Sequence, residues 1–224
     1  MVSIKEILEQ ATLEKKLELL SLMKHEVAME DLAIKDKFKK YKNIILNQSE
    51  SIRFMIDNAI ENNQYLNCRR GIFGAFVLDT NKDLNISGTH FNMPDPKLLE
   101  ECKFSGSCIR ELIDKKHGLS YDNCPATHAR ERLIIEFSKE NSEKLIWVEG
   151  GAVLSDGKMK SWDINKYGAY TCIRCLNYSL LQGVRILAAL GKSGFNENEW
   201  DVSFHSIENH AKYLLARNTV DQMN

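Results

Sequence analysis

The stretch ATHARERLIIEFSKENSEKLIWVEGGAVL, residues 126 to 154, places a helical pattern directly before a strand pattern. The apolar residues between Leu133 and Phe137 favour a helix over residues 126 to 141. The apolar run over residues 143 to 154 is typical of a buried strand. This stretch therefore predicts one helix-strand unit of an α/β fold, and residues 155 to 171 follow it as a long connection.

The segments on either side of this unit continue the alternation of strands and helices. Upstream, GIFGAFVLD (71 to 79) and LNISGTHFN (84 to 92) predict two strands joined by a hairpin. Downstream, CIRCLNYSLLQG (172 to 183) predicts a helix that stops at Gly183, and VRILAAL (184 to 190) predicts a fourth strand. A polar helix around SIENHAKYLLARN closes the order, which is that of a three-layer α/β fold.

Residues 3 to 46 lack glycine and proline and carry apolar residues at helical spacing among charges. They predict an amphipathic helical attachment, residues 1 to 47, in front of a domain that spans residues 48 to 224. We expect this attachment to pack on the domain or on a sister subunit of a homo-oligomer, with a specific recognition role as the alternative.

Composition narrows the classes of partner. The 224 residues include 31 acidic and 30 basic ones, so no strong overall charge favours nucleic acid or an anionic membrane, and a small molecule is the expected partner. No apolar run reaches the roughly 20 residues that span a bilayer, and the charged N-terminus predicts a cytoplasmic protein. Six cysteines in that compartment indicate reduced thiols and metal ligands rather than disulfides.

Three residues form the strongest chemical pattern. His128, Cys172 and Cys175 each lie at the predicted start of a helix, and the Cys-x-x-Cys spacing brings two thiols onto one helical turn. Two thiolates and one imidazole leave the fourth tetrahedral position of Zn²⁺ open, as in catalytic zinc sites. The sequence therefore predicts a zinc ion held by these three side chains.

With these ligands the chain resembles the zinc-dependent cytidine and deoxycytidylate deaminase superfamily, whose signature is His-x-Glu with Pro-Cys-x-x-Cys. The resemblance covers most of residues 50 to 190 and is carried by CRRGIFGAFVLDTNKDLNISGTHFNMP, CIRELIDKKHGLSYDNCPATHA and TCIRCLNYSLLQGVRIL. It implies a cytidine-deaminase-like α/β/α fold with a mixed sheet. It also implies zinc on His128, Cys172 and Cys175, a nucleotide substrate, and Asn92 as a residue that holds the sugar or base.

The chain departs from the family pattern at the residue that should move protons. Arg130 stands where the family has its glutamate, and a guanidinium that is always protonated cannot act as an acid and base. Glu131 is one position late and Glu149 follows the apolar run LIWV. Either could replace the missing carboxylate, although a first-turn helix acid and a loop acid are the plainer interpretations. Thr171 in place of proline and a longer loop before Asn92 are smaller departures.

Further side chains complete the predicted site. Arg130 could anchor an anionic group or be a solvated helix residue, and His90 could contact a base. Arg70 beside Arg69 could bind a phosphate, as in the family, or have a surface role. His25, His205 and His210 are expected to be surface or packing residues. A second, structural zinc is a further possibility, on cysteines and a histidine of irregular spacing: Cys68, Cys102, Cys108, Cys124 and His117.

Three functions are compatible with these residues. The first is a deaminase-like hydrolase that acts on a (deoxy)cytidylate-like nucleotide or a related amino-bearing heterocycle through a zinc-activated water. The second is an inactive deaminase-like subunit or nucleotide sensor that retains structural zinc. The third is different chemistry on the same metal, in which Arg130 anchors an acidic substrate.

Overall fold

The computed structural model describes residues 12–62, 71–94, 126, 127, 129, 133, 144–164, 173–193 and 196–222. The helices in this part of the chain are α2 (Leu13–Phe38), the 3-10 helix η1 (Lys39–Tyr41), α3 (Lys42–Gln48), α4 (Glu50–Asn62), α8 (Ile173–Leu181) and α9 (Ile207–Gln222). The strands are β1 (Gly71–Asp79), β2 (Leu84–Asn85), β3 (His90–Phe91), β4 (Met93–Pro94), β5 (Ala126–Thr127), β6 (Leu145–Ser155), β7 (Lys158–Ser161), β8 (Ile186–Ser193) and β9 (Asn196–Ser206).

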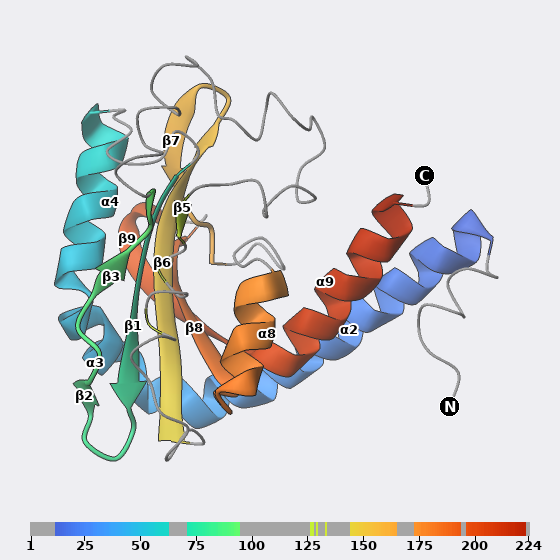
Figure 1. The fold of residues 1–224 in the computed structure, drawn as a ribbon, viewed down its shortest axis with the longest axis horizontal. Coiled ribbons are helices and arrows are strands. Elements are labelled where there is room, and N and C mark those ends of the chain that lie inside the picture. Colours follow the sequence, from blue (N-terminus) through green and yellow to red (C-terminus); the bar gives the residue numbers. More distant parts are fainter. Residues whose placement is uncertain are drawn as a thin grey trace.

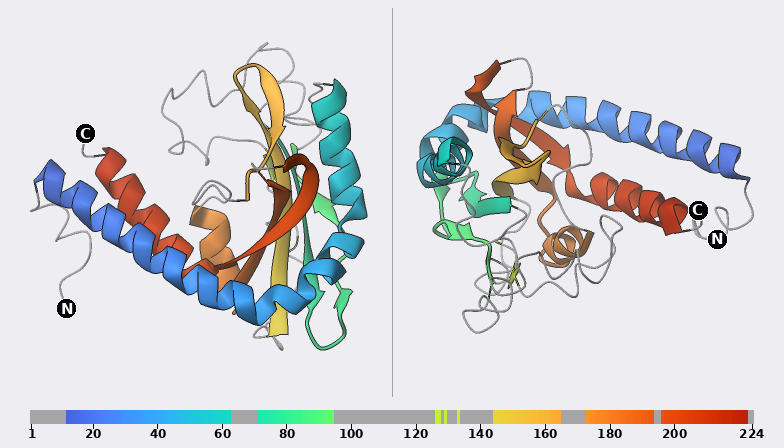
Figure 2. Two further views of the ribbon diagram at one scale, coloured as in Figure 1. Left: turned by 180° about the vertical axis from the view of Figure 1, so that it is seen from behind. Right: turned by 90° about the horizontal axis from the view of Figure 1, so that it is seen from above.

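One mixed sheet organises these elements, and its strand order is β2-β1-β6-β8-β9 (Figure 1). β1 is antiparallel to β6, β6 is parallel to β8, and β8 is antiparallel to β9. β3 pairs with β1, β7 pairs with β6, and β4 and β5 form a separate two-stranded sheet. Helices lie on both faces of the large sheet (Figures 1 and 2), which confirms the prediction of an α/β fold with a mixed sheet.

The two faces of the sheet carry different apolar clusters because side chains alternate along each strand. On the first face, Ile52 and Ile56 of α4 and Ile45 of α3 pack with Phe76 of β1 and Val148 of β6. All five of these side chains have no exposed surface. This face carries the main apolar core.

The second face is covered by segments that are far apart in the sequence. Ala129, Leu133, Leu176 of α8 and Leu214 of α9 pack in one cluster with Trp147 of β6. Ala129 and Leu133 are both helical and both fully buried, as predicted at those two positions. The prediction that this helix begins at residue 126 is wrong, because Ala126 and Thr127 form strand β5 and pair with β4. Ala129 and Leu133 therefore share this face of the sheet with α8, the helix that carries Cys175.

The N-terminal helix α2 is a single helix of 26 residues, and Thr12 caps its start by accepting a hydrogen bond from Lys15 N. Its first half contacts α9, where Leu19, Leu20 and Met23 surround Ala216. Its second half crosses β9, and α2 and α9 lie side by side in both views of Figure 2. The predicted helical attachment thus packs on the domain, while the boundary at residue 47 stays a prediction.

Three segments differ from the sequence prediction. The expected second strand is split into β2 and β3, because Ser87 between them turns its hydroxyl to the backbone N–H of Val77, at 2.8 Å. The expected long connection contains β7, which forms a hairpin with β6 through Asp156 and Gly157 in left-handed conformation. β9 was not expected at all. None of the described helices is long and apolar enough to cross a membrane.

Candidate functional site

One row of five side chains crosses the sheet and contains the candidate catalytic carboxylate. The strand registers pair His90 with Ala75, Ala75 with Glu149, Glu149 with Ala189, and Ala189 with Ser203. Side chains of directly opposed residues point to the same face of a sheet. We call this set of five the cross-sheet row, and it lies on the second face, because Glu149 is two residues from Trp147 on the same strand.

Glu149 lies inside strand β6 and is 7% exposed. Its two neighbours in the row, Ala75 and Ala189, are also buried and have the smallest side chains that a strand commonly carries. A loop acid would be solvated, so the plainer interpretation of Glu149 from the sequence is wrong. Burying a carboxylate costs free energy unless polar groups or charges compensate it. Buried carboxylates of this kind are typical of functional sites.

Cys175 occupies the buried side of α8, with 2% of its surface exposed. The next residue, Leu176, and Ser179 one turn later are fully buried, so this side of the helix faces the sheet. Ser179 anchors the turn by donating its hydroxyl to the Cys175 carbonyl at 2.8 Å. Ala129, which follows His128 directly in the sequence, is buried in the same cluster as Leu176.

Immediately beyond Glu149 the two parallel strands separate. The pairing of β6 with β8 ends at Gly150 and Leu190. Trp162 then bridges the strands, because its N–H donates to Gly151 O at 2.9 Å and its carbonyl accepts from Lys192 N at 3.0 Å. In α/β proteins, ligands bind in crevices outside the carboxyl ends of parallel strands. Glu149 lies at this end of the parallel pair.

Two predicted substrate-binding residues, Asn92 and His90, lie next to strand β1. Asn92 is 5% exposed, and its side chain bonds the backbone of β1 by accepting from Phe73 N at 2.8 Å and donating to Gly71 O at 3.2 Å. These bonds give Asn92 a structural part in the sheet, and its role toward a sugar or base stays a prediction. His90 is half-buried, and its Nε2 lies 3.1 Å from Ser87 O.

The remaining predicted site residues lie outside the part of the chain that the structure describes. They are two zinc ligands, two residues of the His128 helix and the phosphate-binding candidate: His128, Cys172, Arg130, Glu131 and Arg70. The residues of the possible second, structural zinc site lie outside it as well: Cys68, Cys102, Cys108, Cys124 and His117. Of the predicted zinc site, the structure therefore describes only Cys175 and Ala129, the residue that follows His128.

A second polar cluster lies where α2, β9 and α9 meet. Asp31 Oδ2 is 2.7 Å from His205 Nδ1 and 3.0 Å from His210 Nε2, and Asp31 Oδ1 accepts from Ser206 N at 2.9 Å. Ser203 Oγ is 2.6 Å from the other ring nitrogen of His205. Asp31, His205 and His210 are all buried, and their ligand atoms lie close enough together to hold a metal ion.

Burial and hydrogen bonding oppose each other in this cluster. Burial alone raises the pKa of Asp31, but hydrogen bonds and attraction from His205 and His210 outweigh it, so the pKa lies below the ordinary value. Burial lowers the pKa of His205, and the bond to Asp31 offsets this only in part. Asp31 is thus an ionised carboxylate and His205 a neutral imidazole at pH 7.

The sequence prediction that His205 and His210 are surface or packing residues missed this cluster, whereas His25 is exposed as expected. Trp200, Val202 and Phe204 alternate with polar residues in a period of two, which is the signal that could have revealed β9. No local sequence pattern could have predicted the contact of Asp31 with His205, because the two residues are 174 positions apart in the sequence.

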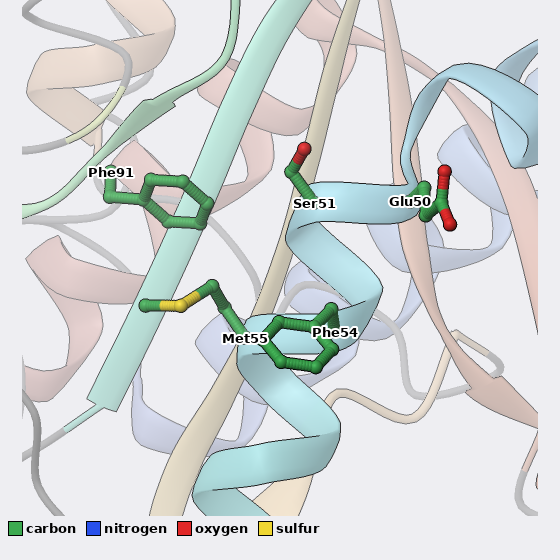
Figure 3. A pocket seen from close by; sticks show the side chains of 5 residues that line it. All are labelled: Glu50, Ser51, Phe54, Met55 and Phe91. Atoms are coloured by element: carbon green, nitrogen blue, oxygen red, sulfur yellow. The ribbon is translucent and has the colours of Figure 1, made fainter.

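A surface hollow lies on the other side of the sheet, between α4 and β3 (Figure 3). Its lining is largely apolar and consists of Glu50, Ser51, Phe54, Met55 and Phe91. Phe91 pairs with Gly74, whose missing side chain would point at Ile52 of the first core, so the hollow is on the first face. It is therefore separated by the sheet from Glu149 and Cys175.

Comparison of the chain with protein-family models, with curated proteins and with solved structures gives no match.

Proposed function

We propose that this chain is a zinc-dependent, deaminase-like hydrolase. It would replace the amino group of a (deoxy)cytidylate-like nucleotide, or of a related amino-bearing heterocycle, by an oxygen from water. The observation that carries the proposal is that Glu149 is buried on the sheet face that also holds Cys175 and Ala129. A carboxylate in that position could supply the acid and base that Arg130 cannot.

The donor set fits zinc. His128, Cys172 and Cys175 would hold the ion, and Cys175 is a buried thiol on the first turn of α8, where a helix N-terminus favours a thiolate. Zn²⁺ bound by three protein ligands makes a water molecule acidic enough to act as a nucleophile near neutral pH. The order of elements also supports the family resemblance, since Ala129 and Leu133 are helical ahead of β6, and α8 precedes β8, the strand parallel to β6.

The protein's own residues would handle protons and charge. Glu149 would accept a proton from the attacking water and return it to the ring nitrogen, and a second proton would leave with the amine as ammonia. The alanines on both sides of Glu149 leave its carboxylate without bulky neighbours in the row. Glu131 is the second candidate for this role, and Arg130 or Arg70 would bind the phosphate of a nucleotide.

A homo-oligomer fits the surface of α2. Five of its apolar side chains are half exposed or more: Leu13, Leu17, Leu22, Met29 and Leu32. An apolar surface of this kind is commonly buried against another chain. A sister subunit is therefore part of the proposal.

An ammonia-release assay tests the function. The substrates are deoxycytidylate, cytidylate and a panel of amino-bearing purine and pyrimidine nucleotides, and the proteins are the parent, Glu149→Gln, Glu131→Gln and Arg130→Glu. We expect turnover by the parent and a loss of about 10²-fold or more in Glu149→Gln, the usual contribution of a proton-transferring group. Glu61→Gln, at an exposed position of α4, is the matched control and should keep full activity.

Two results would redirect the proposal. Turnover that appears only in Arg130→Glu would identify the natural chain as an inactive subunit or nucleotide sensor. A loss in Glu131→Gln with full activity in Glu149→Gln would assign the proton transfer to the first turn of the metal-binding helix. Zinc content and thermal unfolding of each variant separate loss of chemistry from loss of the fold.

A further inference from the structure

We propose that Asp31, His205 and His210 form a second metal site, which takes a divalent first-row ion such as Zn²⁺ and fastens helix α2 to the sheet. This site is independent of the proposed deaminase-like function, because none of its residues belongs to the set His128, Cys172 and Cys175. It joins α2 to two consecutive elements near the other end of the sequence, since Asp31 lies in α2, His205 in β9 and His210 in α9.

The three donor atoms converge on one point. Asp31 Oδ2 lies 2.7 Å from His205 Nδ1 and 3.0 Å from His210 Nε2, and all three atoms are within 4.8 Å of one another. The ring centroids of the two histidines are 4.8 Å apart and nearly edge to face, so both rings aim a nitrogen at the same carboxylate oxygen. Two imidazoles and one carboxylate are a ligand set of zinc and ferrous sites.

The charge of the cluster favours a cation. Asp31 is 9% exposed, and its partners are the two imidazoles and the backbone N–H of Ser206, none of which carries a fixed positive charge. A buried carboxylate is costly in a medium of low polarity unless hydrogen bonds or a positive charge compensate it. A divalent ion would balance it, and neutral imidazoles are the form that binds metals.

The surroundings already provide the outer partners that metal ligands usually have. Ser203 Oγ is 2.6 Å from His205 Nε2, and Ser206 N donates to the second oxygen of Asp31 at 2.9 Å. Such contacts fix the orientation of a metal-binding histidine and of its carboxylate. When an ion replaces the hydrogen on His205 Nδ1, the ring keeps one proton by carrying it on Nε2, where Ser203 Oγ accepts it. The exchange therefore needs no change in the charge of the ring.

Burial decides the role of the site. His205 is 6% exposed and His210 is 4% exposed, so no substrate could reach an ion between them without displacing a helix. The ion would act as a structural fastener, and binding to the folded state alone would make it stabilising. The ion would stabilise the packing of α2 most, because Asp31 is the residue that bonds this helix to the end of β9.

Metal analysis of the full-length protein tests the proposal. The protein is stripped with a chelator under reducing conditions, reloaded with Zn²⁺ and freed of excess metal, and zinc is counted per chain. With both proposed sites present we expect two ions in the parent, one in His210→Gln and one in Cys172→Ser. His25→Gln, at an exposed position of α2, is the matched control and should keep two.

The two proposals fail in different ways. If the cysteine site is absent, the parent binds one ion, Cys172→Ser has no effect, and His210→Gln binds none. If the site proposed here is absent, His210→Gln keeps the zinc content of the parent, which overturns the inference.

A measurement on an unaltered cluster guards against misfolding of His210→Gln. Zn²⁺ is titrated by calorimetry into stripped protein that carries Cys172→Ser and Cys175→Ser. We expect one binding event, and a rise in Tm of roughly 5 to 10 °C at a hundredfold excess of Zn²⁺ over Kd. Replacement by Co²⁺ should give the spectrum of a nitrogen and oxygen site without thiolate bands. No binding and no change in Tm would show that hydrogen bonds alone hold the cluster.

Discussion

The backbone carbonyl oxygen of Trp162 lies so close to Gly191 that a β-carbon at this position would clash with it. Gly191 lies in β8, and Trp162 lies between β6 and β8 after these strands separate, where it also packs its ring on Phe73 at a centroid distance of 5.5 Å. The bridge between the two strands thus includes a backbone contact that depends on a missing side chain.

Replacing Gly191 by alanine should therefore destabilise the protein by about 1 to 3 kcal/mol, the usual cost of overpacking, because the opposing atom is backbone and cannot rotate away. Unfolding in urea measures the effect. Gly157→Ala is the comparison, since its surroundings are open and its φ of 74° alone opposes a side chain. A fall in stability no larger than that of Gly157→Ala would contradict the close contact.

Asn92 offers a test that separates structure from substrate binding. Its buried amide makes two hydrogen bonds to β1, so Asn92→Ala should leave Phe73 N and Gly71 O without these partners and cost about 2 kcal/mol. Urea unfolding should show this loss, whereas KM for any nucleotide substrate should stay near that of the parent. A rise in KM with unchanged stability would instead assign Asn92 to the sugar or base.

Trp200 of β9 donates its indole N–H to Asp57 of α4 at 3.1 Å, and Lys192 forms an ion pair with the same carboxylate at 2.8 Å. Trp200→Phe keeps an aromatic side chain but removes the indole N–H and its hydrogen bond, so we expect a loss of about 1 kcal/mol or more in the free energy of unfolding. Lys42→Ala, which removes an exposed ion pair with Asp201, should cost less than this. Equal effects of the two variants would show that the Trp200 bond adds nothing.

The metal-free protein should lose stability when it is acidified. The pKa of His205 is lowered from its ordinary value of 6.5 by burial, so the folded state resists a proton that the unfolded chain accepts. The stability is fully present above pH 6.5 and falls as the pH decreases below it, by up to about 1.4 kcal/mol per pH unit for one proton. Asp31, whose pKa is also lowered, adds a loss in the same direction below its ordinary value of 3.8.

Urea unfolding at several pH values between 7 and 5 checks this prediction, with His205→Gln as the variant that should flatten the slope. His25→Gln should behave as the parent, because His25 is exposed. Stability that does not change over this range would mean that His205 is protonated as easily in the folded protein as in the unfolded chain.

Much of the fold followed from local patterns. The strand at Gly71–Asp79 and the helix that ends before Gly183 were predicted nearly to the residue, because an unbroken apolar run and a glycine stop are local signals. The prediction of a long connection after β6 was wrong, because this segment contains the polar strand β7. Met159 is the one buried residue of β7, and one apolar residue gives no periodicity that could reveal a strand.

The candidate site was harder to predict because it depends on strand register. The apolar run predicted a strand that includes Glu149, but it could not show which residues flank this carboxylate. The pairing with Ala75 and Ala189 shows that Glu149 lies between two buried alanines inside the sheet. The cluster of Asp31 with His205 and His210 needs a contact between the two ends of the chain, which no spacing reveals. Sequence patterns thus indicated which residue types could bind a metal or a substrate. Which of the charged side chains are buried depends on strand pairing and on contacts between distant segments.

Helix α2 also has a mechanical consequence. At 1.5 Å per residue its 26 residues make a rod about 39 Å long. Asp31 ties the second half of the helix to β9 and α9, while Leu13, Leu17 and Leu22 of the first half are exposed. Figure 1 shows this first half running beside α9. Because the helix is one rigid unit, a partner that binds these exposed leucines would also act on Asp31, and through it on His205 and His210.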